Sequence, residues 1–466
     1  MRVFFVYLDV NNTQPVGYQV GLGYVASMVK SKGHYVKYFS PQTEQEIRAL
    51  LNKIKKDLPE VIAFSCISTQ FKYARLIAKE VRSFYDPKII CGGVHPTLMP
   101  ECILDSEHID VVARGEGEYA FIEYLELLEQ KKSSLHIRNL WIRDGGSIIK
   151  NEIRPLIRNL DDLPFPDREG LDFQTAIDKA GFCSFIFSRG CAFDCYYCCN
   201  SILNKIYGSN YVRFRSAKAS IGEIESVLSK YRVKDINFDD DNFTLNKEWF
   251  FYFIEKYKRT IKRKFICNVR VGTCTFEMFK LLREANCTRV RIGVESGDEQ
   301  FRRAYLNRNM SNKQIIETFE MAHKAGLRTF SFNIIGFPNE TPELFKKTIS
   351  LNAQLHPNHP FLAIFYPYPK THLRDLCEHD KLLIDAQPEN RDMREREESV
   401  LNLPNFSNKE IIYYYKNMKY LVLKKISLFH LFYFVCLENA KRVLSAILNK
   451  IRKLLDFLQT YLKVKK

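Results

Sequence analysis

The strongest constraint on the fold is the repeated alternation of short apolar runs with amphipathic stretches in the first 130 residues. The apolar runs cover residues 2–8, 35–39, 61–65, 88–91 and 109–112, and helical patterns cover 23–32, 44–56, 71–84 and 119–129. Strands separated by helices form βαβ units, whose parallel sheet is buried on both faces. We therefore expect a flavodoxin-like, doubly wound α/β domain over residues 1–135. Such a sheet binds ligands outside the carboxyl ends of its strands.

A second βα series follows a connecting segment. Residues 136–175 contain a predicted β-hairpin around Asp144-Gly145-Gly146 and a linker with Pro164 and Pro166. The later apolar runs cover residues 183–188, 235–239, 265–269, 288–292, 329–335 and 362–366. Six strands, each followed by a helical stretch, predict a partial (β/α)6 barrel over residues 176–390. Chemistry in such barrels takes place at the carboxyl ends of the strands.

A cluster of cysteines follows the first strand of this second series. Cys191, Cys195 and Cys198 are separated by three and by two residues, so one loop can hold three thiolates around an iron–sulfur cluster. The sequence shows no secretory signal, and in a reducing compartment clustered cysteines indicate metal or catalysis rather than disulfides. The alternative is a structural zinc site that also uses Cys199, although adjacent Cys198 and Cys199 would then share one tetrahedron.

The pattern C-x-x-x-C-x-aromatic-C resembles the signature of the radical S-adenosylmethionine (SAM) superfamily. The resemblance implies a 4Fe–4S cluster on Cys191, Cys195 and Cys198, with SAM on the open iron and Tyr197 near the adenine. It also implies that the reduced cluster splits SAM into methionine and a 5′-deoxyadenosyl radical, which abstracts a hydrogen atom from the substrate. An electron donor such as flavodoxin or ferredoxin is implied as well.

The same resemblance implies SAM contacts at the ends of the later strands. They are Asp240 and Asp241 for the amino group, Arg270 for the carboxylate, Glu295 and Ser296 for the ribose, and Gly336 for the adenine. The alternative for each residue alone is an ordinary turn or helix cap.

The order of the two domains resembles the cobalamin-binding subclass of this superfamily. Ser65-Cys66-Ile67 and Gly92-Gly93 match the second and third parts of its motif, but Asn11 stands where the axial histidine is expected. Cobalamin without a protein ligand to cobalt is one hypothesis, and a domain kept only as a substrate lid is the other. The segment 114–118 also resembles this subclass and is expected to face the barrel.

These alternatives lead to different functions. With cobalamin, we expect methyl transfer to an unactivated carbon of a small-molecule or lipid-like substrate. Without it, a radical cyclisation, oxidation or rearrangement is equally open. A non-catalytic, metal-stabilised binding protein is the alternative from another class.

The carboxy-terminal segment 391–466 is predicted to form a basic, amphipathic helical tail. The net charge of the chain is +16, and more than half of the excess falls in residues 401–466. No segment has the ~18–20 uninterrupted apolar residues of a membrane span. The basic face is therefore either solvated on helices packed against the barrel or bound to an anionic membrane surface. We expect a cytoplasmic protein, with peripheral contact at the inner membrane surface as the alternative. We do not expect nucleic acid as a partner, because no recognised RNA-binding module is present.

Overall fold

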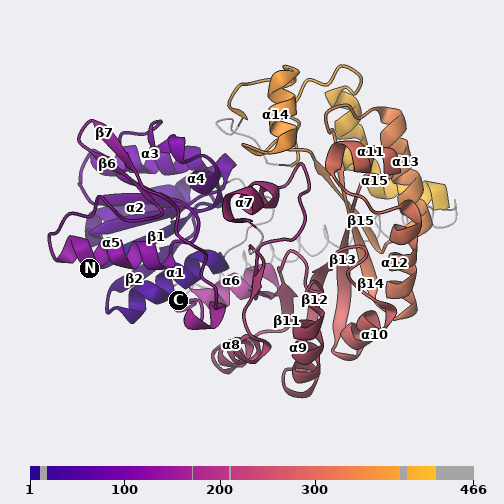
Figure 1. The fold of residues 1–466 in the computed structure, drawn as a ribbon, viewed down its shortest axis with the longest axis horizontal. Helices are drawn as coiled ribbons and strands as arrows, with labels where there is room; N and C mark the ends of the chain where they lie inside the picture. The colour runs from indigo at the N-terminus through magenta and orange to yellow at the C-terminus, as the bar shows by residue number, and fades with distance from the viewer. Residues whose placement is uncertain (11–17, 171, 209–210, 389–395, 427–466) are drawn as a thin grey trace, which may run out of the picture.

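The computed structural model of the protein describes residues 1–10, 18–170, 172–208, 211–388 and 396–426. Two α/β units lie side by side (Figure 1). The strands of the first sheet are β1 (Arg2–Tyr7), β2 (Tyr35–Phe39), β3 (Val61–Ser65), β4 (Lys88–Gly92), β5 (Val111–Ala113), β6 (Leu140–Asp144) and β7 (Ser147–Lys150). Its strand order is β2-β1-β3-β4-β5-β6-β7, and β1 to β5 run parallel. The order 2-1-3-4-5 is flavodoxin-like, as predicted.

Alternating side chains of the parallel strands enter two separate cores. Phe5 of β1 packs in a cluster with residues of α1 and α5, whereas Phe4 packs in a cluster with residues of α2 and α3. Successive side chains of a strand point to opposite faces, so an apolar run without polar interruptions is needed to bury both. The helices are α1 (Val20–Ser31), α2 (Glu44–Asp57), α3 (Phe71–Arg82), α4 (Val94–Leu98) and α5 (Glu118–Glu129).

The hairpin that we expected in the connecting segment extends the first sheet instead. β6 pairs antiparallel with β5, with Val111 opposite Ile142, and β7 pairs with β6. Leu140, Trp141 and Ile142 are buried by this pairing. The hairpin covers the edge of β5, whose unpaired backbone groups would otherwise be open to other chains.

The second unit is an open barrel of six parallel strands. They are β8 (Cys183–Phe185), β11 (Asp235–Phe238), β12 (Lys264–Val269), β13 (Cys287–Glu295), β14 (Arg328–Ile335) and β15 (His359–Ile364). The order β15-β14-β13-β12-β11-β8 leaves β15 and β8 as edges. This is the predicted partial (β/α)6 barrel. The remaining helices are α6 (Phe173–Ala180), α7 (Cys199–Tyr207), α8 (Ala217–Lys230), α9 (Lys247–Thr260), α10 (Phe276–Glu284), α11 (Glu299–Leu306), α12 (Asn312–Lys324), α13 (Pro342–Leu355), α14 (His372–His379) and α15 (Asn408–Ile426).

Three barrel strands differ from their predicted bounds by three residues at one end, and the middle one of these, β13, ends at Glu295 instead of residue 292. The first ends at Phe185, because the chain then turns into β9 (Ser188–Arg189), which pairs antiparallel with β10 (Arg213–Phe214). The last begins at His359 and includes Pro360, a residue that an edge strand tolerates because its outer side needs no donor.

The linker between the two units is fixed by a buried arginine. Arg168 is 5% exposed, and it donates to Glu223 Oε1 of α8 at 3.0 Å. Its guanidinium also lies 4.8 Å from the ring centroids of Tyr18 and Phe185. Because these partners come from both units, Arg168 holds the path that Pro164 and Pro166 begin.

The described part of the basic carboxy-terminal segment packs on the barrel. Ile411, Met418 and Val422 of α15 are buried against α13 and β15. Residues 427–466 of the predicted tail lie outside the described residues. Within the described ranges, no helix has the length and apolar character to cross a membrane.

We predict that Phe238→Ala destabilises the apoprotein by about 3–5 kcal/mol in chemical denaturation, because deletion of a fully buried ring leaves a cavity. Phe238 has no exposed surface, and six aromatic rings surround it, among them Phe243 at 4.8 Å. The control is Tyr252→Ala on the surface of α9, where a change within about 0.5 kcal/mol is expected. Equal effects of the two substitutions would contradict this assignment of the core.

Candidate active site

The three predicted cluster cysteines lie on one loop at the carboxyl end of the barrel. The loop leaves β9 through Gly190, which has φ 87° and whose added Cβ would lie 2.6 Å from Tyr211 O. The turn therefore requires glycine. The Cys198 N–H donates to Cys195 O at 3.0 Å, and α7 begins at the next residue. The structure thus presents Cys191, Cys195 and Cys198 from one short segment, with Cys199 already in the helix.

Two arginines approach the middle cysteine. Arg270 Nη1 lies 3.6 Å and Arg308 Nη1 lies 3.8 Å from Cys195 Sγ. Guanidinium groups at this distance stabilise a thiolate and offset the negative charge of an iron–sulfur cluster. The donor set of three cysteines with two arginines therefore fits a 4Fe–4S cluster.

A zinc ion and an iron–sulfur cluster place different demands on the geometry of their cysteine ligands. Among the described residues, no three His, Cys, Asp or Glu side chains converge closely enough to hold one metal ion. A zinc ion needs four ligands within bonding distance, whereas each thiolate of a 4Fe–4S cluster binds a different iron.

Arg308 also organises the residues predicted to contact SAM. It donates to Tyr197 OH at 3.2 Å and to Gly293 O at 2.6 Å, and its Nη1 lies 3.6 Å from Glu295 Oε1. Burial raises the pKa of Glu295, while Arg308 and Tyr197 oppose that shift. Tyr197, Glu295, Arg270 and Arg308 are therefore brought together beside Cys195. Sequence reasoning did not identify Arg308, because an arginine after a helix end is usually a surface residue.

The two aspartates after β11 have different surroundings. Asp240 Oδ1 accepts hydrogen bonds from Phe187 N and Ser188 N, so this residue holds the strand that leads to the cluster loop. Burial raises the pKa of Asp240 to about 6, although these hydrogen bonds lower it. Asp241 accepts from Asn200 Nδ2 of α7 at 3.0 Å. It also lines a cavity between the first sheet and the cluster loop.

The remaining two predicted SAM contacts, Ser296 and Gly336, are held through their backbone atoms by buried side chains. The carbonyl of Ser296 accepts from Arg302 Nη1 at 2.6 Å, and its side chain is fully buried. Gly336 has φ 85°, and its N–H donates to Glu340 Oε2 at 2.6 Å. Burial raises the pKa of Glu340 to about 8, against the hydrogen bonds from the backbone. The structure does not bring Ser296 into contact with the cluster loop.

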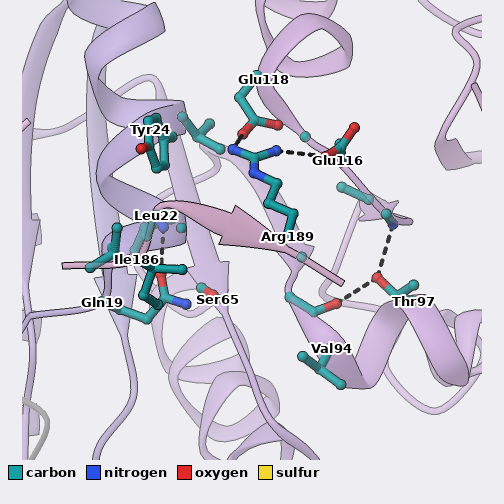
Figure 2. Close-up of a pocket in the computed structure, with 18 of the residues that line it drawn as sticks. Gln19, Leu22, Tyr24, Ser65, Val94, Thr97, Glu116, Glu118, Ile186 and Arg189 are labelled. Carbon is teal, nitrogen blue, oxygen red and sulfur yellow. Dashed lines mark hydrogen bonds and ion pairs between the residues drawn. The ribbon is translucent and has the colours of Figure 1, made fainter. Parts of the chain in front are cut away.

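A cavity of about 510 Å³ lies between the first sheet and the cluster loop (Figure 2). Ser65, Gly92 and Gly93, the residues predicted to contact cobalamin, all line it. Gly93 has φ 102°, and a Cβ there would lie 2.7 Å from Cys66 O, so the close backbone approach requires glycine. Asn11 lies outside the described residues. His95 hydrogen bonds to Ser68 Oγ at 3.2 Å, and burial lowers its pKa to about 4.

The opposite wall of the cavity comes from the second unit and the linker. Asn200, Leu203 and Tyr207 of α7 face the first sheet across it. The hydroxyl of Tyr207 is buried and has no hydrogen-bond partner among the described residues. A largely apolar cavity with a glycine-lined floor and an unsatisfied hydroxyl fits a large ring cofactor that carries amide groups. The linker supplies Leu156, Leu160 and Leu163, which no periodicity in the sequence marked as cavity residues.

Ion pairs also connect the first unit with β9, the strand that leads into the cluster loop. The sequence predicted the acidic side of these ion pairs but not the arginine. Arg189 Nη1 donates to Glu116 Oε1 at 2.7 Å, and Arg189 Nη2 donates to Glu118 Oε1 at 2.5 Å. The segment 114–118 therefore faces the barrel, as expected. Arg189 was not identified from the sequence as the partner of Glu116 and Glu118, because its position just before the cysteines does not indicate an ion pair.

Comparisons with known proteins agree with this geometry. Residues 185–351 match the family model of the radical SAM superfamily, and residues 8–125 match that of the B12 binding domain. An uncharacterized methyltransferase of Pyrococcus horikoshii is 30% identical over 79% of this chain and 80% of its own length. The anaerobic magnesium-protoporphyrin IX monomethyl ester cyclase of Cereibacter sphaeroides is 24% identical over 80% of this chain and 63% of its own length.

The fold is shared with a solved methyltransferase. The radical S-adenosylmethionine methyltransferase TsrM of Kitasatospora setae, solved with cobalamin and a [4Fe-4S] cluster, superimposes with a TM-score of 0.68. The two chains are 14% identical, and the match covers 81% of this chain and 75% of that one. The cluster loop, the cavity and these relatives together show that the chain is an enzyme of the radical SAM superfamily with an amino-terminal B12-binding domain.

Proposed function

We propose that this chain is a cobalamin-dependent radical SAM methyltransferase that acts on an unactivated carbon of a small molecule. The observation that carries the proposal is the shared cavity. It is lined by Ser65, Gly92 and Gly93 of the B12-binding domain and by Asp241 and Cys199 next to the cluster loop. Because residues of both units line this one cavity, a corrinoid held there would be next to the cluster loop, and both cofactors could act on one substrate.

The residues of this chain have distinct parts in that reaction. When bound, the 4Fe–4S cluster supplies the electron that splits SAM, and cobalamin supplies a carrier for the methyl group. Cys191, Cys195 and Cys198 would hold the cluster, and Arg270 and Arg308 would compensate its charge through Cys195. Glu295 and Tyr197, both in contact with Arg308, would orient the nucleoside of SAM. The apolar cavity wall would exclude water from the reacting groups.

We further propose that cobalt receives no imidazole from this chain, because the sequence has Asn11 where the cobalamin motif has its axial histidine. His95 is engaged with Ser68 and packs against Phe71 at 4.7 Å. The cavity itself retains the other two parts of the motif. This supports bound cobalamin over a domain kept only as a lid.

A radical cyclase is the second candidate function, and the Cereibacter sphaeroides relative favours it. The two functions consume SAM differently. Methylation converts one SAM to S-adenosylhomocysteine and another to 5′-deoxyadenosine and methionine, whereas cyclisation needs only the second conversion.

We also propose that flavodoxin or ferredoxin supplies the reducing electron and that the protein works in the cytoplasm. The basic carboxy-terminal segment is proposed to contact an anionic membrane surface, which would suit a lipid-like substrate. The carboxy-terminal part of this segment, 427–466, holds eight of its sixteen Lys and Arg residues. Co-sedimentation of the full-length protein with anionic liposomes tests this; no binding would remove it.

We predict that the reconstituted protein forms both S-adenosylhomocysteine and 5′-deoxyadenosine from SAM under dithionite when hydroxocobalamin and a small-molecule extract are supplied. The methyl group of labelled SAM should appear in a new product, which mass spectrometry detects. Formation of 5′-deoxyadenosine with no label transfer from any extract would favour the cyclase.

We predict that Cys191→Ala, Cys195→Ala and Cys198→Ala each abolish the cluster signal in electron paramagnetic resonance, along with 5′-deoxyadenosine formation. An open-iron cluster with two remaining thiolates is lost. Cys199→Ala, one residue further along, is the matched control and should retain both. Retention of the cluster by any of the three variants would refute the ligand assignment.

We predict that Ser65→Trp weakens retention of hydroxocobalamin by about tenfold or more, because an indole at the cavity wall takes up space needed by the corrin ring. Ser83→Trp, on the exposed end of α3, is the control for the same change of side chain. The measurement is corrinoid absorbance after gel filtration. Equal retention by both variants would place the corrinoid elsewhere.

A further inference from the structure

The short strand that leads into the cluster loop is fixed from the barrel side. β9 consists of Ser188 and Arg189, and Cys191 follows after one glycine. Asp240 Oδ1, at the end of β11, accepts from Phe187 N at 2.9 Å, Ser188 N at 2.6 Å and Ser188 Oγ at 2.5 Å. Three hydrogen bonds to one buried carboxylate oxygen fix the start of β9 relative to the barrel.

The end of the same strand is fixed from the B12-binding domain. Figure 2 shows the Arg189 side chain between Glu116 and Glu118, with Tyr24 nearby. The distances are 2.7 Å to Glu116 and 2.5 Å to Glu118, and the guanidinium lies 5.1 Å from the Tyr24 ring centroid. The exposed fractions of the three charged side chains are 20%, 15% and 4%, so water screens these contacts weakly. We call Arg189 with Glu116 and Glu118 the carboxylate clamp.

A second arginine ties the clamp to the linker. Arg213 pairs across the β9–β10 ladder with Arg189 and donates to Glu116 Oε1 at 2.9 Å. Arg213 Nη1 also donates to Ile157 O at 2.7 Å, and Ile157 N donates to Glu116 Oε2 at 2.8 Å. The carboxylate of Glu116, in the B12-binding domain, therefore contacts both the linker and the paired strands β9 and β10.

A role in holding the two units together does not by itself explain why these buried contacts are ion pairs. Buried ion pairs carry a desolvation cost that often cancels their attraction, and apolar side chains of similar volume would join the two surfaces as well. Bidentate and charge-assisted hydrogen bonds differ from apolar contacts in direction, because they fix one relative placement of the groups. Arg189, Glu116 and Glu118 also line the cavity. Their hydrogen bonds therefore fix the position of the cluster loop relative to the cavity wall.

We propose that Arg189 is a positioning residue: the carboxylate clamp holds the corrinoid cavity and the cluster loop at one fixed separation. This rests on the proposed function, since it concerns the placement of the two cofactors of that reaction. Between Asp240 and the clamp, β9 is held at both ends by different units. Neither cofactor then needs to search for the other after binding.

The test is a pulsed electron paramagnetic resonance measurement on full-length protein reconstituted with iron, sulfide and cobalamin. Partly reduced samples contain cob(II)alamin and the reduced cluster, two paramagnets whose dipolar coupling reports their separation. The unmodified protein should give a resolved splitting, corresponding to one narrow distance. Arg189→Met should lose the resolved splitting while both cofactors remain bound.

Glu118→Gln provides a second variant that keeps Arg189 beside the cluster loop and weakens the clamp from the other domain. It should broaden the splitting, and it decides the question if Arg189→Met fails to fold or loses its cluster. Arg82→Met is the matched control, because Arg82 forms an ion pair with Asp110 and neither residue lines the cavity. It should leave the splitting unchanged.

An unchanged splitting in Glu118→Gln or in a cofactor-loaded Arg189→Met would overturn the clamp but leave the proposed function intact. Failure of the unmodified protein to retain corrinoid would instead overturn the proposed function, and the clamp with it. The two failures are therefore distinguishable in one series of samples.

Discussion

The active site depends on how one two-residue strand is held. β9 has too few residues to define its own position, and within the described ranges it pairs with one strand, the equally short β10. Its place is set by carboxylates from outside, Asp240 of the barrel on one side and Glu116 and Glu118 of the B12-binding domain on the other. The three cluster cysteines follow from this strand within ten residues. Local secondary structure contributes little there, and long-range polar contacts contribute most.

The same pattern of charge recurs around the cluster loop itself. Arg270 and Arg308 come from the ends of β12 and α11, far apart in sequence, and both reach Cys195. Arg308 then extends the contact to Tyr197 and Glu295. A buried arginine that donates to several acceptors is restricted to one side-chain conformation, because each hydrogen bond excludes rotamers that would break it. The cluster loop is thus held by side chains of the barrel in addition to its backbone hydrogen bonds, such as the one from Tyr196 N to Leu306 O.

The sequence predicted the two sheets well because a parallel strand buried on both faces leaves an uninterrupted apolar run, as in Val3 to Val6. It predicted the hairpin but not its partner, since the pairing of β6 with β5 is a tertiary contact. The cysteine loop and the Ser65 and Gly93 positions could be found because chemistry fixes their spacing. Arg189, Arg308 and the linker leucines could not, because their roles depend on segments far away in sequence. Asp240 was identified as a site residue, yet its strongest visible contacts are to the β9 backbone.

The cavity wall made of three segments has a thermodynamic consequence. Leu156, Leu160 and Leu163 of the linker close a space whose other sides belong to the two units. Occupancy of that space and docking of the units are therefore reciprocally linked. If the units are apart in some fraction of the molecules, the apparent association constant for the occupant falls by that fraction. The occupant in turn raises the stability of the docked arrangement in proportion to the logarithm of its concentration.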